Sequence, residues 1–160
     1  MEGIEGSVTY RPIIRVLESR DVEPVLAIQI ACSEVAQWTA WDYGRVVDGE
    51  GEMIGWVAEG SARVVGVLIV RRVASDIEIL NLAVQADVRR CGIGTCLLRC
   101  ALDWGRANQA EKAFLEVRIS NLPALRFYER HKFEATSRRP RYYQAPIEDA
   151  LLLTASLTRR

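Results

Sequence analysis

The segment from Ile77 to Leu97 constrains the fold most, because an apolar strand runs directly into a glycine-containing turn that opens a helix. The strand reads IEILNLAV, the connection reads QADV, and the turn and first helical residues read RRCGIGTCLL. Gly92 and Gly94 carry no side chains, so backbone N–H groups there can approach phosphate oxygens closely. The helix adds unpaired N–H groups and the positive end of its dipole. The segment therefore predicts a pyrophosphate-binding loop.

Two well-known phosphate loops do not fit this segment. A P-loop needs Lys directly after its last glycine, and Thr95 follows Gly94 here. A dinucleotide-binding fingerprint needs a small residue three positions after the second glycine, and position 97 is Leu. A glycine turn with a purely steric role is the alternative. The arginines at positions 89 and 90 favour the phosphate interpretation.

The residues from Arg89 to Gly94 resemble the pyrophosphate loop of the GNAT superfamily of acyl-CoA N-acyltransferases, whose pattern is Q/R-x-x-G-x-G/A. The segment 115–153, LEVRISNLPALRFYERHKFEATSRRPRYYQAPIEDALLL, narrows the resemblance. It is similar to the C-terminal half of RimI-type enzymes, which acetylate the α-amine of a protein and, in the type member, an alanine of a ribosomal protein. The similarity covers about Ile77 to Leu157, and the first 70 residues match only loosely.

The resemblance implies an α+β fold in which helices flank a mixed central sheet, and acetyl-CoA as cosubstrate. The hydrophobic patterning indicates the same fold class, because strands and helices mix around one sheet. We expect strands at Ile13–Leu17, Met53–Ala58, Arg63–Val70, Asp76–Val84 and Ala113–Ile119, a turn at Glu59–Ser61, and a closing hairpin of Phe133–Arg138 with Asp149–Leu157. We expect helices from a cap at Asp21 through Cys32, within Val35–Val47, from the glycine loop to about Asn108, and from Asn121 onward.

Composition limits the class of protein. Nearly half of the 160 residues are hydrophobic, which predicts one globular domain over residues 12–160 after a loose lead-in, residues 1–11. The 21 basic and 21 acidic residues balance, which argues against a nucleic-acid partner. No run is long enough for a membrane span, so no membrane partner is expected. Because the sequence shows no export signal, we expect a cytoplasmic enzyme.

The four cysteines, at positions 32, 91, 96 and 100, form no C-x-x-C pair. No histidine cluster completes a metal site, so we expect small apolar side chains in a reducing compartment and no metal. Cys91 is the exception, because it lies in the glycine loop between arginines and a helix start. That position is expected to lower the pKa of its thiol.

Transfer of an acetyl group to an amine needs a base for the amine and a proton for the departing thiolate. Glu116 stands where the resemblance implies the base, and an ordinary salt bridge with Arg118 is the alternative. Glu78, on the neighbouring strand, is the second candidate and can instead be a cross-strand carboxylate. Tyr128 matches the general acid of the resembling enzymes, and core packing is compatible with that role.

The resemblance also implies the cofactor and substrate contacts. Asn121 can be an N-cap, a CoA contact or both. The implied cofactor contacts are Leu82, Ala83, Val84, Arg89, Arg90, Cys91, Gly92, Ile93, Gly94, Thr95 and Asn121. The implied substrate contacts are Trp38, Trp41, Tyr142 and Tyr143, and the nearby arginines 138, 139 and 141 form either a solvated hairpin or a surface for acidic or RNA-linked partners.

One departure from the family pattern lies after the last helix, where Leu-Gly-Phe is replaced by His131-Lys132-Phe133. Lys132 then occupies a position that favours glycine, at a cost of about 1 kcal/mol. A helix C-terminus favours a cationic imidazole, so His131 is expected to be cationic and structural.

The leading hypothesis is an acetyl-CoA-dependent N-acetyltransferase that modifies a protein N-terminus. One alternative is an acetyltransferase for a small amine, such as a polyamine or an antibiotic. Another is a CoA-binding module without turnover. An open groove lined by tyrosines favours the first, and a closed acidic pocket favours the second.

Overall fold

The computed structural model describes residues 11–158, so residues 1–10 of the predicted lead-in lie outside the described residues. The strands are β1 (Ile13–Val16), β2 (Met53–Gly60), β3 (Arg63–Val73), β4 (Asp76–Val84), β5 (Lys112–Arg118), β6 (Glu134–Gln144) and β7 (Ile147–Ser156). The helices are α1 (Val22–Ile30), α2 (Ala40–Val47), α3 (Ile93–Ala107) and α4 (Leu122–Arg130). Their order along the chain is the predicted one. None of these helices is long and apolar enough to cross a membrane.

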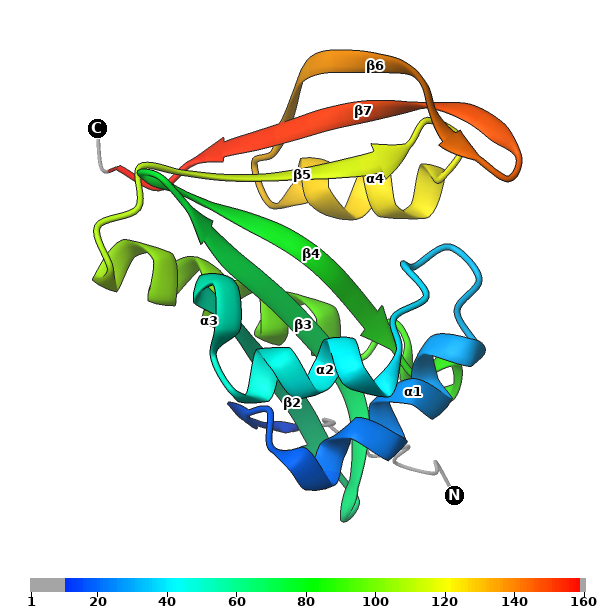
Figure 1. The fold of residues 1–160 in the computed structure, drawn as a ribbon, viewed down its shortest axis with the longest axis vertical. Coiled ribbons are helices and arrows are strands. Elements are labelled where there is room, and N and C mark those ends of the chain that lie inside the picture. The colour runs from blue at the N-terminus through cyan, green and yellow to red at the C-terminus, as the bar shows by residue number, and fades with distance from the viewer. Residues whose placement is uncertain (1–10, 159–160) are drawn as a thin grey trace, which may run out of the picture.

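The strands form one seven-stranded sheet in the order β1-β2-β3-β4-β5-β7-β6. Every pair is antiparallel except β4 with β5, so the predicted mixed sheet is confirmed. The parallel pair is short, since only Ile77 opposite Ala113 and Glu78 opposite Phe114 are in register. Beyond these residues β4 and β5 diverge, and the sheet opens toward their carboxyl ends (Figure 1).

Helices cover both faces of the β1–β4 half of the sheet, and strand alternation assigns side chains to the two faces. Val67 and Ile69 of β3 pack with α1 and α2, whereas Leu68 and Val70 pack with α3 on the opposite face. All four side chains are fully buried. The core against α3 continues to α4, β5 and β7, which joins the two halves of the sheet behind the opening (Figure 1).

The closing hairpin is longer than its sequence pattern predicts. Its first strand runs to Gln144, and its second begins at Ile147. The β6 side chains are exposed along almost the whole strand. Without a buried face, β6 shows no apolar alternation, so its extent cannot be recognised in the sequence. The predicted turn at Glu59–Ser61 also shifts, because Gly60 pairs with Arg63 and the turn residues are Ser61 and Ala62.

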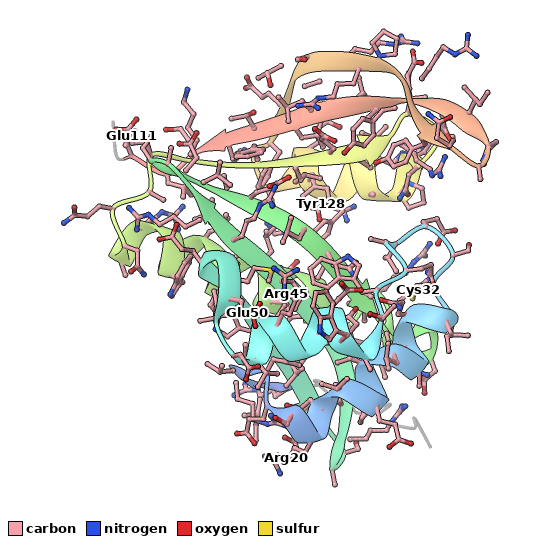
Figure 2. The ribbon with its side chains drawn as sticks, viewed as in Figure 1. Arg20, Cys32, Arg45, Glu50, Glu111 and Tyr128 are labelled. Atoms are coloured by element: carbon pink, nitrogen blue, oxygen red, sulfur yellow. The ribbon has the colours of Figure 1, made fainter. Side chains whose placement is uncertain are left out.

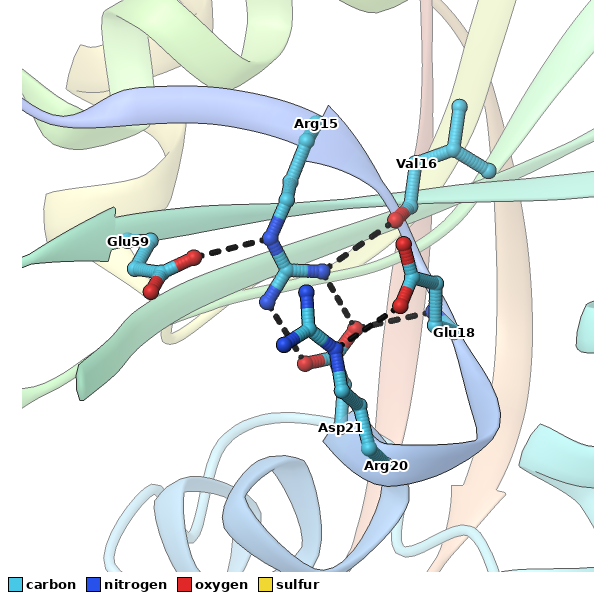
Figure 3. Close-up of polar contacts among 6 residues, drawn as sticks. All are labelled: Arg15, Val16, Glu18, Arg20, Asp21 and Glu59. Atoms are coloured by element: carbon cyan, nitrogen blue, oxygen red, sulfur yellow. Dashed lines mark hydrogen bonds and ion pairs between the residues drawn. The ribbon is translucent and has the colours of Figure 1, made fainter. Parts of the chain in front are cut away.

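Asp21 does not cap α1 with its side chain, which corrects the prediction from the sequence. Its carboxylate instead accepts hydrogen bonds from Arg15 at 2.7 and 2.8 Å and from the Glu18 backbone N–H at 2.8 Å (Figure 3). Arg15 also donates to Glu59 of β2. Burial alone would raise the pKa of Asp21, but these hydrogen bonds keep it below its ordinary value. The cluster ties β1 to β2 and to the start of α1.

Asp21→Asn should therefore lower the free energy of unfolding by about 2 kcal/mol at pH 7, since hydrogen bonds to charged groups contribute roughly 1.5–3 kcal/mol each. Because folding lowers the pKa of Asp21, its contribution is present above the unfolded value of about 3.9 and is lost as the pH falls through the folded value. Urea denaturation at pH 7 and pH 3 measures the change. Arg106→Gln, which removes an exposed pair with Asp103 outside this cluster, is the control. An equal loss for Asp21→Asn at both pH values would contradict the assignment.

Candidate active site

A cleft of about 540 Å³ lies where β4 and β5 separate. Its walls come from segments far apart in the sequence, namely the loop after α1, the diverging strands, α4 and the β6–β7 hairpin. The lining residues are Ser33, Glu34, Val35, Ala36, Gln37, Glu78, Ile79, Leu80, Asn81, Leu82, Leu115, Glu116, Val117, Arg118, Asn121, Ala124, Tyr128, Tyr142, Tyr143 and Ala145. The structure thus brings both predicted base candidates, the predicted acid and both predicted substrate tyrosines to one cleft.

A β-bulge shapes the β4 wall. Asn81 is opposite Ile69 and Ile79 is opposite Val70, which leaves Leu80 without a partner on β3. Bulges bend a strand and change the direction of its side chains. The bulge lies where β4 turns away from β5, and its three residues line the cleft.

A second cavity of about 440 Å³ leads from this cleft toward the glycine loop. Its lining includes Cys32, Leu82, Ala83, Val84 and Arg89. The two cavities adjoin, because both are lined by Glu34, Val35, Leu82, Arg118 and Asn121. A continuous channel therefore runs from the glycine loop to the carboxylates.

The glycine loop has the geometry that the sequence predicts. Gly92 is the N-cap of α3 in the left-handed region, with φ of 80°, and Arg90 before it has φ of 64°. The N–H of Cys96 bonds the Gly92 carbonyl, so the N–H groups of residues 93–95 precede the first intrahelical bond. Three backbone donors at a helix N-terminus form an anion-binding arrangement.

The side chains of the loop differ in their contacts. Arg89 folds back, and its guanidinium donates to the Val84 carbonyl at 3.2 Å and to Cys32 Sγ at 3.1 Å. Arg90 and Cys91 are exposed, and Cys91 Sγ lies 3.7 Å from the Arg89 carbonyl oxygen. Arg89 therefore joins the loop to the end of β4 and to the segment after α1, while Arg90 faces solvent.

Glu116 is nearly buried, with 13% of its side chain exposed, and its ion-pair partner is Arg139 at 3.0 Å. The alternative interpretation of Glu116, a salt bridge with Arg118, names the wrong partner, because Arg118 pairs with Glu148. Tyr142 also lies against Glu116, and its hydrogen bond to that carboxylate is the main reason that the pKa of Tyr142 rises to about 12. Glu116 thus faces the cleft from β5, and Arg139 of the β6–β7 hairpin pairs with its carboxylate.

Glu78 is the cross-strand carboxylate that its alternative interpretation predicts. It stands directly opposite Arg71 of β3, which reaches one carboxylate oxygen with Nη2 at 2.7 Å and Nε at 2.8 Å. Glu78 also lines the cleft. It therefore has a structural partner and a place in the site.

Tyr128 combines packing with access to the cleft (Figure 2). Its ring contacts Phe127 and Phe133 edge to face at centroid distances of 5.1 and 5.3 Å, within the main core. Burial raises the pKa of its hydroxyl well above the ordinary value. The phenol therefore stays protonated across the working pH range, as a proton donor requires.

His131 is structural, as expected, but the expected charge is wrong. Burial, together with Arg99 and Arg130, lowers the pKa of its imidazole despite the helix C-terminus. Its Nε2 lies 3.1 Å from Thr95 Oγ1, which links the end of α4 to the start of α3. Lys132 has φ of 69°, so the predicted left-handed position is confirmed.

Arg118 fixes the β6–β7 turn above the cleft. Its guanidinium contacts the carbonyl oxygens of Ala145 and Pro146 and the Glu148 carboxylate, each at 3.3 Å. It also lies 4.1 Å from the centroid of the Tyr143 ring, a cation–π distance. Glu148 in turn accepts from the Ser120 N–H, so one network orients Tyr143 and the hairpin.

A buried network that no sequence pattern indicates holds the loop after α1. Asn81 donates to the Tyr43 hydroxyl at 3.2 Å, and Tyr43 donates to Gln29 at 2.7 Å. Gln29 then bonds both the N–H and the carbonyl of Trp38. Because Asn81 stands at the β4 bulge, the network fixes the distance between the loop and β4.

The two predicted substrate tryptophans lie outside the lining of both cavities. Trp38 packs on Tyr43 at a centroid distance of 5.4 Å, and exposed Trp41 stacks with Arg45. Residues 33–37, just before them, line the cleft instead. Asn121 caps α4 by accepting from the Ala124 N–H, and it lines both cavities. Within residues 11–158, no cluster of three or more His, Cys, Asp or Glu side chains is arranged to hold a metal.

A sheet opened at one parallel pair, with a helix N-terminus at the far end of its channel, is the architecture of an acyl-CoA-dependent transferase. The family model of the Acetyltransferase (GNAT) family matches residues 18–133. The chain therefore belongs to the GNAT family, and it is an N-acetyltransferase of that family.

Named relatives agree with this family. The chain is 34% identical over 123 residues to an N-alpha-acetyltransferase of Sulfolobus acidocaldarius, covering 72% of this chain and 71% of that protein. It is 34% identical over 98 residues to the ribosomal protein bS18-alanine N-acetyltransferase of Salmonella typhimurium, covering 60% and 66%. With the N-alpha-acetyltransferase of Sulfurisphaera tokodaii, 39% identical over 80 residues, the match spans about half of that protein, 47%.

Solved structures confirm the fold. The ribosomal-protein-S18-alanine N-acetyltransferase of Escherichia coli aligns with a TM-score of 0.81 at 23% identity, over 94% of this chain and 96% of that one. Arabidopsis thaliana NAA60, solved in complex with acetyl-CoA, aligns with a TM-score of 0.80 at 20% identity, over 91% and 98%. The sequence match to the ribosomal protein bS18-alanine N-acetyltransferase of Salmonella typhimurium confirms the resemblance to RimI-type enzymes.

Proposed function

We propose that this protein transfers the acetyl group of acetyl-CoA to the α-amine of a protein N-terminus. The observation that carries the proposal is the meeting of the two cavities. Glu116 and Tyr128 line one, the glycine loop borders the other, and the tyrosines of the hairpin stand at the acceptor side. Relatives named as N-alpha- and alanine N-acetyltransferases support an N-terminal amine as acceptor.

The channel assigns acetyl-CoA a direction. Its pyrophosphate binds the N–H groups at the start of α3, with Arg90 beside it, and its pantetheine arm follows the second cavity. Beyond Glu78, β4 has no register partner on β5, so the backbone groups of Leu82 and the N–H of Val84, which point away from β3, are available to the arm. The thioester then reaches the first cavity, next to Asn121 and Tyr128.

Two side chains carry the chemistry, Glu116 as the base and Tyr128 as the acid. An α-ammonium has a pKa near 8, so a carboxylate such as Glu116 can accept its proton directly or through one water. The free amine attacks the thioester carbonyl, and the tetrahedral intermediate expels the CoA thiolate. Tyr128, protonated at any working pH, donates a proton to that sulfur and regains one through solvent as the new amide nitrogen releases its second proton. Tyr142 and Tyr143 contact the first residues of the acceptor.

The four free thiols are consistent with a reducing compartment, the cytoplasm.

Acetyl transfer from acetyl-CoA to a library of short peptides with free N-termini, read by mass spectrometry, tests the function. We expect a subset of N-termini to gain one acetyl group on the α-amine, with internal lysines unmodified. A matched library with blocked N-termini is the control. Transfer to polyamines or aminoglycosides but to no peptide would overturn the proposal and favour a small-amine acceptor.

Gly94→Glu should weaken acetyl-CoA binding by more than tenfold, about 1.4 kcal/mol, because it places an anion against the pyrophosphate. A Cβ at Gly94 would lie 3.4 Å from the Phe127 ring, an ordinary contact, so Gly94→Ala is a matched control that keeps the fold. Calorimetric titration with CoA compares the two. Equal CoA affinity in the Glu variant and the wild type would remove the loop from the cofactor site.

Glu116→Gln should reduce kcat/KM most at pH values where the acceptor amine is still protonated, and the defect should shrink as the pH rises past about 8. The reason is that a free amine needs no base before it attacks. Glu78→Gln, which removes the other cleft carboxylate, is the matched comparison, and pH profiles from pH 6 to 9.5 measure both. If Glu78→Gln shows the larger pH-dependent defect, the base lies on β4 and not on β5.

Tyr128→Phe should keep the fold and the CoA affinity but lower kcat by about 10²–10⁴-fold, the usual contribution of general acid catalysis. Only a hydroxyl is removed, so the ring contacts with Phe127 and Phe133 are kept. Stopped-flow measurement under single-turnover conditions isolates the chemical step. A fall of less than threefold in that step would leave Tyr128 with packing alone.

A further inference from the structure

The ion pair of Glu116 is unequal. The carboxylate is nearly buried, whereas 57% of the Arg139 side chain is exposed, and Arg139 Nε lies 3.0 Å from Glu116 Oε1. A buried charge that loses its partner is costly, but an exposed guanidinium regains water when it leaves. The anion therefore requires a cation next to it, and Arg139 can leave at low cost.

Arg139 reaches Glu116 across an intervening strand. It is opposite Ala150 of β7, and Ala150 is opposite Arg118 of β5, two residues from Glu116. Directly opposite residues and residues two apart on a strand share a face, so these side chains lie on the same face of the sheet. Ala150 is fully buried and small, which leaves room for the guanidinium to cross β7.

The hairpin is irregular where it presents this arginine. The register passes from Arg139 opposite Ala150 to Tyr143 opposite Glu148, so residues 140–142 stand against Asp149 alone. Arg141 has φ of 53°, and its N–H bonds the Asp149 carboxylate. The irregular segment carries Tyr142 to 5.6 Å from the Arg139 guanidinium and beside Glu116, where an acceptor amine would enter.

We propose that Arg139 is a displaceable cation that balances the charge of Glu116 until the α-ammonium of the acceptor takes its place. This inference rests on the proposed function and adds to it the basis on which the cleft selects a protonated amine. One cation replaces another, so the carboxylate never stands unpaired. Transfer of the ammonium proton to Glu116 then frees the amine for attack.

The same exchange favours release of the product. The acetylated product is a neutral amide and offers Glu116 no positive charge. Once Glu116 has passed its proton to solvent, Arg139 can balance the negative charge of the carboxylate, whereas the neutral product cannot. Arg139 is thus a positioning residue, which acts through Glu116 and discriminates the substrate from its product.

Arg139→Gln tests the exchange, because it removes the competing cation and keeps a polar side chain. We expect the KM for the acceptor to fall about two- to fivefold, the size of a partly exposed ion pair, while kcat changes less than twofold. Arg139→Lys keeps a cation and should restore a KM close to that of the wild type. Arg138→Gln is the matched control, since Arg138 is adjacent, equally exposed and paired with Asp149.

Three results would overturn the proposal. A higher KM in Arg139→Gln would mean that Arg139 binds the acceptor directly. A lower kcat at unchanged KM would mean that it acts only on the chemical step. An equal fall in KM for Arg138→Gln would mean that the whole positive surface repels the amine.

Failure of the proposed function is distinguishable from failure of this inference. If the peptide library is not acetylated but a small amine is, the function is wrong, and the KM comparison is repeated with that amine. Binding without turnover is read from the ¹³C shift of the Glu116 carboxyl during titration with a free-amine peptide and its Nα-acetylated form. We expect the free amine alone to shift it, at lower concentration in Arg139→Gln, and equal shifts with both peptides would reject the exchange.

Discussion

The separation of β4 and β5 after two paired positions is the constraint on which the site depends. Each strand is held on its other side by a full antiparallel partner, β3 for β4 and β7 for β5. The two halves of the sheet are therefore stable without pairing to each other beyond Glu78 and Phe114. Backbone groups along the opened edges still require hydrogen-bond partners, which water or a bound amide can provide. A sheet of this kind contains a ligand-binding edge in its interior.

The parallel direction of the same pair explains why two helices begin at the cleft. Each strand of a parallel pair is followed by a connection at the same edge, so α3 after β4 and α4 after β5 both have their N-termini there. Gly92 begins α3, and Asn121 begins α4 where the two cavities meet. His131 and Thr95 then connect the far end of α4 to the start of α3. The helix that follows the glycine loop and the helix that carries Tyr128 are thus linked directly.

The parts of the molecule that could be predicted from sequence have local causes. The glycine loop is specified by Gly92 and the helix that follows it, and β5, which has one buried face, shows the alternation of a strand. The partners of charged residues could not be predicted in the same way. The sequence predicts Asp21 as a helix cap, but its carboxylate accepts hydrogen bonds from Arg15. Glu116 pairs with Arg139, 23 positions away, rather than with Arg118. Such choices depend on strand register, which one sequence does not reveal.

The cleft itself shows the same division. Glu116 and Tyr128 are identifiable because a resemblance to a family assigns them, whereas the network from Asn81 through Tyr43 to Gln29 consists of ordinary polar residues on three elements. Only the β4 bulge and the packing of α1 and α2 bring them together. The loop at positions 33–37 therefore lines the site because of a distant network, and the tryptophans that the resemblance suggested lie beside it.

The two carboxylates of the cleft differ in how firmly their charge is held. Glu78 faces Arg71 directly across one ladder position, and two guanidinium nitrogens contact the same oxygen. Glu116 is paired with Arg139, a residue two strands away on an edge strand that is exposed almost along its whole length. An acceptor cation competes more easily with the second arrangement than with the first. The geometry of the partners, more than the burial of the acids, is the physical reason to place the base on β5.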